Sequence, residues 1–252
     1  MKKKKRVLVG TWAEIPSAYV TNVMARAGFD FSIIDMEHGI IDFNIAQNMV
    51  FAAHAAEKSI YIRVPAIEEA WVTRVLDTGC DGIIFPGVSS LDDVNKIVRL
   101  CCFAPEGQRG FNPFVPAGNY HKVTSDYFKT ENERIKIGVI LEGKEVFTQI
   151  DEILAIPQID ILYVGQYDLS IALGIPGDVA SPKVIELMDF TVSKARKVGK
   201  SVGCMVHSIQ EADEAILKGF SFIVYKVDCD ILYESINNFL NGISNIEPCC
   251  IF

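Results

Sequence analysis

The sequence has no excess of basic residues. Lysine and arginine together number 24 against 32 aspartates and glutamates, which gives a formal net charge of -8 at pH 7. A nucleic-acid binder needs clustered cations to neutralise phosphates. The only basic run here is Lys2 to Arg6. We therefore predict that the protein does not bind nucleic acid and that this run is a solvated N-terminal tail.

Long apolar segments are lacking as well. No stretch approaches the ~20 residues of a membrane span, and the basic run has neither the apolar region nor the cleavage site of a signal peptide after it. The seven cysteines include no CxxC pair and no spacing with histidine suited to zinc. These absences predict a soluble, cytoplasmic protein with reduced thiols and no membrane partner.

What the sequence does contain is a regular alternation of apolar and amphipathic stretches. Its 252 residues, half of them hydrophobic, match the length of one (β/α)8 domain. Eight β-branched, apolar runs predict eight strands buried on both faces of a parallel sheet. The runs are VLVGTW, FSIIDMEH, IYIRVP, GIIFPGV, IGVILEG, IDILYVG, SVGCMV and FSFIVYKV. We predict an α/β fold, a TIM barrel over about residues 7–228.

Glycines mark the ends of the predicted helices. Gly28, Gly79, Gly199 and Gly219 each follow a stretch with helical spacing, as residues that end helices in a left-handed conformation do. A doubly wound sheet is the alternative for such an alternation. It is disfavoured because the first strand is not followed by a GxGxxG turn.

One long segment, about 103–136, interrupts the alternation with several prolines, glycines and aromatic residues. Connections of this length are usually functional or disordered, and the aromatic residues indicate order. Because the segment comes after the fourth strand, one hypothesis is that it lies over the pocket and closes it. The other is that it is a surface excursion that packs against a neighbouring subunit.

Two acidic residues, Glu142 and Asp168, lie at the ends of consecutive predicted strands. In a barrel, the carboxyl ends of neighbouring strands face one pocket. The two carboxylates are therefore predicted to share a divalent metal ion. An oxygen-ligated site that leaves positions for water and substrate suits Mg²⁺ or Mn²⁺, with Co²⁺ as a further option, rather than structural zinc.

The second and third predicted strands end in further polar residues. His38 is a candidate general base, and Asp35 is the nearest carboxylate that could orient its ring. Arg63 ends the third strand and is permanently charged. It is predicted either to pair with Glu37 or Asp35 or to contact an anionic substrate.

Taken in order, these segments resemble the HpcH/HpaI aldolase family, whose members include 4-hydroxy-2-oxoheptanedioate aldolase and 2-keto-3-deoxy sugar acid aldolases. The resemblance extends from about residue 8 to residue 240. It is carried by GTW at 10–12, DMEHG at 35–39, IRVP at 62–65, LDTG at 76–79, IFPGV at 84–88, RG at 109–110, LEG at 141–143 and GQYDLSIALGIPG at 165–177.

The resemblance implies a class II pyruvate aldolase on a TIM barrel. By position, Glu142 and Asp168 match the metal-binding acids, and Arg63 matches the arginine that contacts the pyruvyl oxygen. His38 and Asp35 match the acid/base pair. Such an enzyme cleaves a 4-hydroxy-2-oxo acid to pyruvate and an aldehyde, and the cation stabilises the pyruvate enolate.

The resemblance also implies roles outside this central set. Trp12 matches an aromatic residue that lines the pocket, and Gly165 and Tyr167 are expected to contact the substrate. Asp77 matches an aspartate that approaches the active site of an adjacent subunit. The helix at about 229–243 is expected to be exchanged between subunits, in a homo-hexamer built of dimers, and residues 244–252 form a tail of no assigned role.

Three alternatives to this activity remain open. A covalent class I mechanism would need a lysine of lowered pKa at a strand end, and the candidates are Lys144 and Lys226. An oxaloacetate decarboxylase or related lyase would use the same metal-stabilised enolate. A binding protein without turnover is suggested by Ile140, where the heptanedioate aldolases have glutamine, and by Tyr167, which replaces a small residue. Lys226 stands where a glycine is usual.

Overall fold

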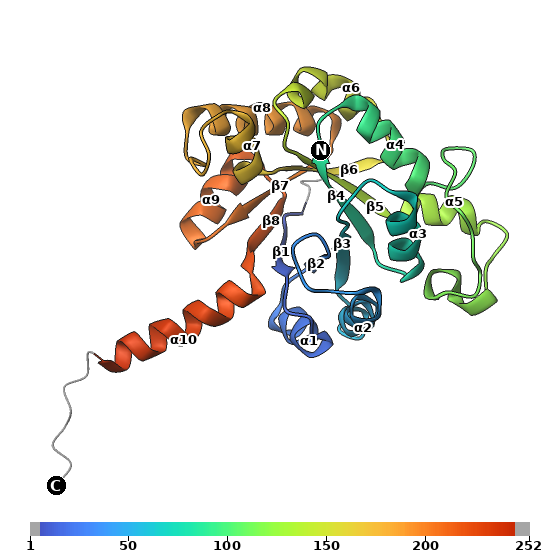
Figure 1. Ribbon diagram of the computed structural model, residues 1–252, viewed down its shortest axis with the longest axis horizontal. Helices are drawn as coiled ribbons and strands as arrows, with labels where there is room; N and C mark the ends of the chain where they lie inside the picture. The colour runs from blue at the N-terminus through green and yellow to red at the C-terminus, as the bar shows by residue number, and fades with distance from the viewer. Residues whose placement is uncertain (1–5, 245–252) are drawn as a thin grey trace, which may run out of the picture.

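Eight parallel strands close into a barrel in chain order, and helices surround it (Figure 1). This confirms the predicted fold class. The computed structural model describes residues 6–244. Most of the basic run predicted as a tail, and residues 245–252 with their two cysteines, therefore lie outside the described residues.

All eight predicted runs form strands. They are β1 (Leu8–Ala13), β2 (Phe31–Asp35), β3 (Ser59–Arg63), β4 (Gly82–Val88), β5 (Lys136–Leu141), β6 (Ile159–Val164), β7 (Ser201–Val206) and β8 (Phe222–Val227). The parallel register sets Asp35 of β2 directly beside Arg63 of β3. Asp35 and Arg63, which are far apart in the sequence, thus lie side by side at the ends of adjacent strands.

Helices alternate with these strands. They are α1 (Ala18–Ala27), α2 (Phe43–His54), α3 (Glu69–Asp77), α4 (Leu91–Cys101), α5 (Tyr127–Arg134), α6 (Ile150–Ala155), α7 (Gln166–Ala172), α8 (Pro182–Val198), α9 (Ile209–Lys218) and α10 (Asp228–Ser244). Two 3₁₀ helices, η1 (Pro116–His121) and η2 (Glu145–Gln149), complete the set.

Local sequence explains where several helices begin and end. The side chains of Ser17, Asp42 and Ser208 each accept a hydrogen bond from a backbone N–H in the first turn of the helix that follows. Gly199 and Gly219 end α8 and α9 in the left-handed conformation, as predicted.

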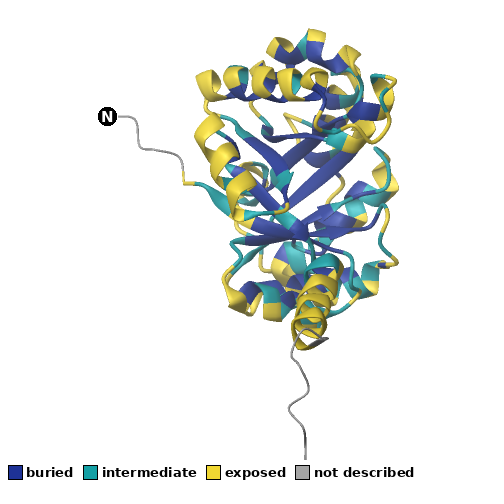
Figure 2. Ribbon diagram, turned by 90° about the vertical axis from the view of Figure 1, so that its left-hand side faces the viewer, coloured by how far each residue is buried: buried dark blue, intermediate teal, exposed yellow. Residues whose placement is uncertain are grey.

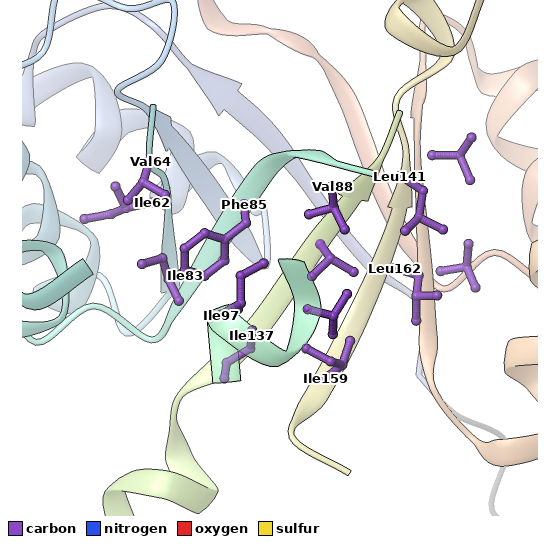
Figure 3. Packing of buried hydrophobic residues seen from close by; sticks show 14 of the residues in the cluster. Ile62, Val64, Ile83, Phe85, Val88, Ile97, Ile137, Leu141, Ile159 and Leu162 are labelled. Carbon is purple, nitrogen blue, oxygen red and sulfur yellow. The ribbon is translucent and has the colours of Figure 1, made fainter. Parts of the chain in front are cut away.

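Apolar side chains fill two layers of the barrel. The outer layer lies between strands and helices, and Figure 3 shows Ile62 of β3, Phe85 of β4 and Leu162 of β6 packing there. The strands are mostly buried, whereas the helices expose their outer faces (Figure 2). The sheet therefore has the burial on both faces that its continuous apolar runs predicted.

Aromatic rings occupy the barrel interior near the strand starts. The Phe31 and Phe222 rings stack with their centroids 4.0 Å apart, and Tyr61 packs edge-on against both. Gly10 and Gly82 make room for these rings, since a Cβ would lie 2.4 Å from Phe31 and 2.5 Å from Tyr61. The open space of the barrel is at the opposite end.

The long segment does not cover the carboxyl ends of the strands. It connects α4 to β5, and in a barrel such helix-to-strand connections lie at the amino ends of the strands. Arg134, just before β5, donates to the Cys80 carbonyl, just before β4, at 3.1 Å. The hypothesis that this segment closes the pocket of its own chain is wrong.

The last helix, α10, stands away from the barrel (Figures 1 and 2). Its side chains from Leu232 to Ile243 are exposed to solvent in one chain. Among the helices of residues 6–244, none combines the length and apolar character that a membrane crossing requires.

Candidate active site

A cavity of about 270 Å³ opens at the carboxyl ends of the strands, where predicted site residues come together. The predicted residues in its wall are Trp12, His38, Arg63, Glu142, Gly165, Tyr167 and Asp168. The wall also includes Glu14, Ile140, Tyr163, Val164, Gln166, Met205 and Val227. Its wall thus combines apolar side chains with the three acids Glu14, Glu142 and Asp168.

Glu142 follows β5 and is the more enclosed of the two predicted metal-binding acids. Its Oε2 accepts a hydrogen bond from the Gly87 N–H at 2.7 Å. Burial and the nearby charge of Asp168 raise the pKa of Glu142 to about 7. Burial and mutual repulsion make it unfavourable for both carboxylates to be ionised at once. A bound cation would remove this repulsion, so the pair is suited to a metal ion.

Two small residues hold this acidic pair in place. A Cβ on Gly165 would lie 2.9 Å from Glu142 Cγ, so only glycine lets β6 end this close to the glutamate. Asp168 lies in the first turn of α7. Buried Ser170 fixes that turn, because its hydroxyl donates to the Tyr167 carbonyl at 2.6 Å and accepts from Gly177 N–H at 2.9 Å.

The donor chemistry of the pair fits a hard divalent cation. Within residues 6–244 there is no group of three or more His, Cys, Asp or Glu side chains arranged to hold a metal ion. The candidate ligands in the cavity wall are therefore the predicted pair, Glu142 and Asp168. Mg²⁺ is commonly held by one or two carboxylates, with water and substrate oxygens completing its octahedron.

The raised pKa of Glu142 predicts how the metal-free protein responds to pH. An acid with a raised pKa binds its proton more tightly when folded, so stability falls as pH rises from about 4.5 to about 7. In EDTA, the melting temperature of Glu142→Gln is expected to fall less than that of wild type between pH 5 and 8. Glu145→Gln, an exposed acid nearby, is the control, and parallel curves for all three proteins would contradict the assignment.

Arg63 is held by two acids and one ring. Its Nε and Nη2 donate to the Asp35 carboxylate at 2.9 and 2.5 Å, and its Nη1 lies 3.0 Å from Glu37. The guanidinium carbon lies 4.4 Å from the centre of the Trp12 ring. Burial alone would lower the pKa of Arg63, but hydrogen bonds and charge interaction with Asp35 raise it.

His38 does not have the partner that the sequence predicted. The Asp35 carboxylate accepts a hydrogen bond from the His38 backbone N–H at 3.2 Å. Its side-chain partner is Arg63, whose Nε donates to it. The acid beside the imidazole is Glu37, 3.7 Å from His38 Nε2. The prediction that Asp35 orients the histidine ring is corrected accordingly, and the acid beside the ring, Glu37, lies too far from Nε2 for a hydrogen bond.

Glu14 is a wall residue that sequence reasoning missed. Burial, followed by the charges of Asp35 and Asp228, raises its pKa. Asp228, at the start of α10 and only 1% exposed, accepts from the backbone N–H groups of Glu14 and Ile15 at 3.0 and 3.1 Å. The position of Glu14 directly after β1 was the available sequence signal, because strand ends in a barrel face the pocket.

Asp77 is not in the cavity of its own chain. It ends α3, close to the start of β4, and so lies at the amino-end side of the barrel. Burial raises its pKa while the charge of Arg109 opposes the rise. A contact between Asp77 and the site of an adjacent subunit stays a prediction.

Neither candidate lysine of a class I mechanism is placed as a nucleophile. Lys144 is 62% exposed and lies beside Glu145. Lys226 is nearly buried, has a φ of 49°, and directs its ammonium group to Asp230 and Glu234 of α10. The hydrogen bond with Glu234 raises its pKa, which keeps it protonated. Of the three departures from the family pattern, Ile140 and Tyr167 line the cavity and Lys226 does not.

Part of the cavity wall is hydrophobic. Ile140 is 2% exposed, and the Tyr163 ring packs edge-on against Trp12 with a centroid distance of 5.9 Å. The Tyr163 hydroxyl is buried without a hydrogen-bond partner in the described residues. Such a wall keeps water from one side of a bound substrate.

Comparisons with known proteins match this architecture over nearly the whole chain. A family model for HpcH/HpaI aldolase/citrate lyase matches residues 8–234. The chain is 33% identical over 233 residues to a hydroxypyruvate/pyruvate aldolase of Paraburkholderia phytofirmans, covering 90% of this chain and 89% of that protein. It is 25% identical over 235 residues to a 2-keto-3-deoxy-L-rhamnonate aldolase of Escherichia coli O157:H7, covering 93% and 88%.

Among solved structures, a HpcH/HpaI aldolase/citrate lyase family protein from Burkholderia cenocepacia J2315 superposes with a TM-score of 0.90 at 29% identity, covering 95% of each chain. Fold and site together define a (β/α)8 enzyme whose paired acids and arginine meet at the carboxyl ends of the strands. The chain belongs to the HpcH/HpaI aldolase/citrate lyase family. Its aldolase relatives support a lyase activity.

Proposed function

We propose that this protein is a class II aldolase that cleaves a 4-hydroxy-2-oxo acid to pyruvate and an aldehyde. The observation that carries the proposal is the convergence of Glu142, Asp168, Arg63 and His38 on one cavity. Because two relatives are named as aldolases of 2-oxo acids, the proposal also agrees with the family's chemistry. Hydroxypyruvate belongs among the donors to be tested, since the name of one relative includes it.

Glu142 and Asp168 would hold the divalent metal ion, Mg²⁺ or Mn²⁺, with Co²⁺ as a further option. When bound, the cation supplies Lewis-acid stabilisation of the negative charge that develops on the 2-oxo group as the C3–C4 bond breaks. The raised pKa of Glu142 means that proton and cation compete for this carboxylate.

Arg63 contributes fixed positive charge. Asp35 and Glu37 orient its guanidinium, and Trp12 supports one face of it. A guanidinium carries five N–H donors, so hydrogens remain for a substrate oxygen after these contacts. Because its position is set before substrate binds, little reorganisation is needed when charge develops on the substrate.

His38 is the proposed base. Its side chain is 67% exposed and reaches the cavity wall, where it can take the proton of the 4-hydroxyl group. The acid beside the ring is Glu37, whose Oε2 lies 3.7 Å from Nε2. In the synthetic direction, His38 would return this proton to the aldehyde oxygen.

The test is pyruvate release from a panel of 4-hydroxy-2-oxo acids, with added Mg²⁺ or Mn²⁺ and with EDTA. Cleavage that requires the added cation is the expected result. Release that survives EDTA would contradict the class II mechanism, and no release from any member of the panel would favour a binding protein without turnover.

Oxaloacetate decarboxylation is the second candidate function. Loss of carbon dioxide gives the same pyruvate enolate but needs no base at a 4-hydroxyl, and the His38 side chain is 67% exposed. The variant His38→Asn separates the two activities, because it is expected to reduce aldol cleavage strongly and to spare decarboxylation. Wild-type protein that accepts only oxaloacetate would make decarboxylation the function.

We also propose that the protein assembles as a homo-oligomer through α10, as a hexamer of exchanged dimers. One face of this helix presents Leu232, Ile236, Phe239, Leu240 and Ile243, each about half exposed or more. Exposure of such an apolar stripe to water is energetically unfavourable, and the helix stands away from the barrel that could cover it. Exposed Tyr19, Val23 and Phe51 on α1 and α2 offer apolar surface to the helix of a second copy, and a two-fold exchange would bury both helices.

Light scattering tests the assembly. Phe239→Glu is expected to shift wild-type oligomers toward smaller species, because it places a charge in the apolar stripe. Asn238→Glu, on the opposite face by helical spacing, is the matched control and should leave the mass unchanged. A monomeric wild-type protein would refute the proposal.

A further inference from the structure

We infer that the site selects an uncharged, hydroxylated aldehyde as the partner of the 2-oxo acid, and that Glu14 is the residue that rejects aldehydes carrying their own carboxylate. The inference rests on the proposed aldolase function and adds the substrate class. Its basis is the set of charges around the cavity.

The cavity contains a single permanent cation. Of the described residues that line it, only Arg63 is lysine or arginine. Three of its nitrogens already face carboxylate oxygens, two on Asp35 and one on Glu37. Its remaining N–H groups suffice for one substrate oxygen, and no second cation is left for the far end of a dicarboxylic substrate.

Negative charge remains after every pairing that the site permits. A divalent cation would balance Glu142 and Asp168, and Arg63 balances buried Asp35. Glu37 shares this same arginine, and Glu14 forms no ion pair with a basic side chain of residues 6–244. The 2-oxo acid brings a further carboxylate of its own. A second carboxylate on the aldehyde would therefore enter a site with surplus negative charge.

Glu14 is fixed at a position where its negative charge would repel such a carboxylate. Asp228 holds the backbone of Glu14 and Ile15, and the Glu14 carboxylate lies 4.0 Å from Cys229 Sγ in a half-buried position on the cavity wall. Two residues earlier, Trp12 supports Arg63. Glu14 is thus on the same wall as the group that binds the 2-oxo acid.

The same carboxylate is a good partner for hydroxyl groups. Carboxylate oxygens accept hydrogen bonds and donate none when ionised, so Glu14 suits the O–H groups of a polyhydroxylated aldehyde. Gln166 offers a complementary amide, whose Nε2 donates, among residues 6–244, to the weak acceptor Met188 Sδ at 3.2 Å. Like charges brought together in a partly buried site cost enough to discriminate by about tenfold or more.

The experiment is aldol addition of pyruvate, with Mg²⁺, to glycolaldehyde and glyceraldehyde on one side and succinic semialdehyde on the other. Wild type is expected to favour the uncharged aldehydes in kcat/KM. Glu14→Gln keeps size and hydrogen bonding but removes the charge, and it should reduce that preference about tenfold, mainly through a lower KM for succinic semialdehyde. Glu14→Asp should keep the preference. Glu145 is an acid outside the cavity, so Glu145→Gln should leave kcat/KM for both kinds of aldehyde unchanged.

The outcomes separate this inference from the function on which it rests. Wild type that favours succinic semialdehyde, or a preference unchanged in Glu14→Gln, would overturn the role of Glu14 while leaving the aldolase intact. No product with any of the three aldehydes, and no pyruvate release in the cleavage assay, would overturn both.

Discussion

Glu142→Gln and Asp168→Asn are each expected to lower metal-dependent pyruvate release by about 10³-fold or more. Each substitution keeps the shape of the side chain but removes one of the two acids proposed to hold the cation. Loss of Lewis-acid stabilisation of the enolate costs several kcal/mol of transition-state energy, which corresponds to that factor.

The control for both variants is Glu145→Gln, because Glu145 is an exposed acid close to Glu142 in sequence. Titration calorimetry with Mn²⁺ adds a readout independent of turnover, in which Glu142→Gln should bind the ion more weakly than wild type. Full activity in either variant would remove that residue from the metal site.

Arg63→Ala is expected to abolish activity and to reduce the free energy of unfolding by about 3–5 kcal/mol. The reason is that Asp35 is fully buried, and removal of its partner leaves an uncompensated charge in the interior. Denaturant unfolding of the metal-free protein measures the effect without depending on catalysis.

A double replacement tests that explanation. Asp35→Asn combined with Arg63→Met removes both charges, so it should recover much of the lost stability while activity stays absent. A double variant no more stable than Arg63→Ala would show that the loss comes from packing rather than from the buried carboxylate.

The barrel could be predicted because its physical cause is visible locally. Runs such as GIIFPGV and SVGCMV are apolar at every position, as strands covered on both faces must be, and glycines end the helices between them. The meeting of Glu142 and Asp168 followed from topology alone, since consecutive strand ends share one rim.

The errors arose where topology or side-chain direction decided the outcome. The segment 103–135 follows a helix rather than a strand, and this difference moves it from one end of the barrel to the other. Asp35, Glu37 and His38 are close in sequence, so the pattern could not tell which acid faces the imidazole. That choice depends on Arg63, which the strand register sets beside Asp35.

The junction between β8 and α10 has a mechanical consequence. The helix begins at the residue after the strand ends. Its first side chain, Asp228, accepts hydrogen bonds from the backbone N–H groups of Glu14 and Ile15. Lys226 ties the same helix back to the barrel through Asp230 and Glu234. The first turn of α10 is therefore part of the frame of the pocket, and loss of the Asp228 carboxylate would release the segment that carries Trp12 and Glu14.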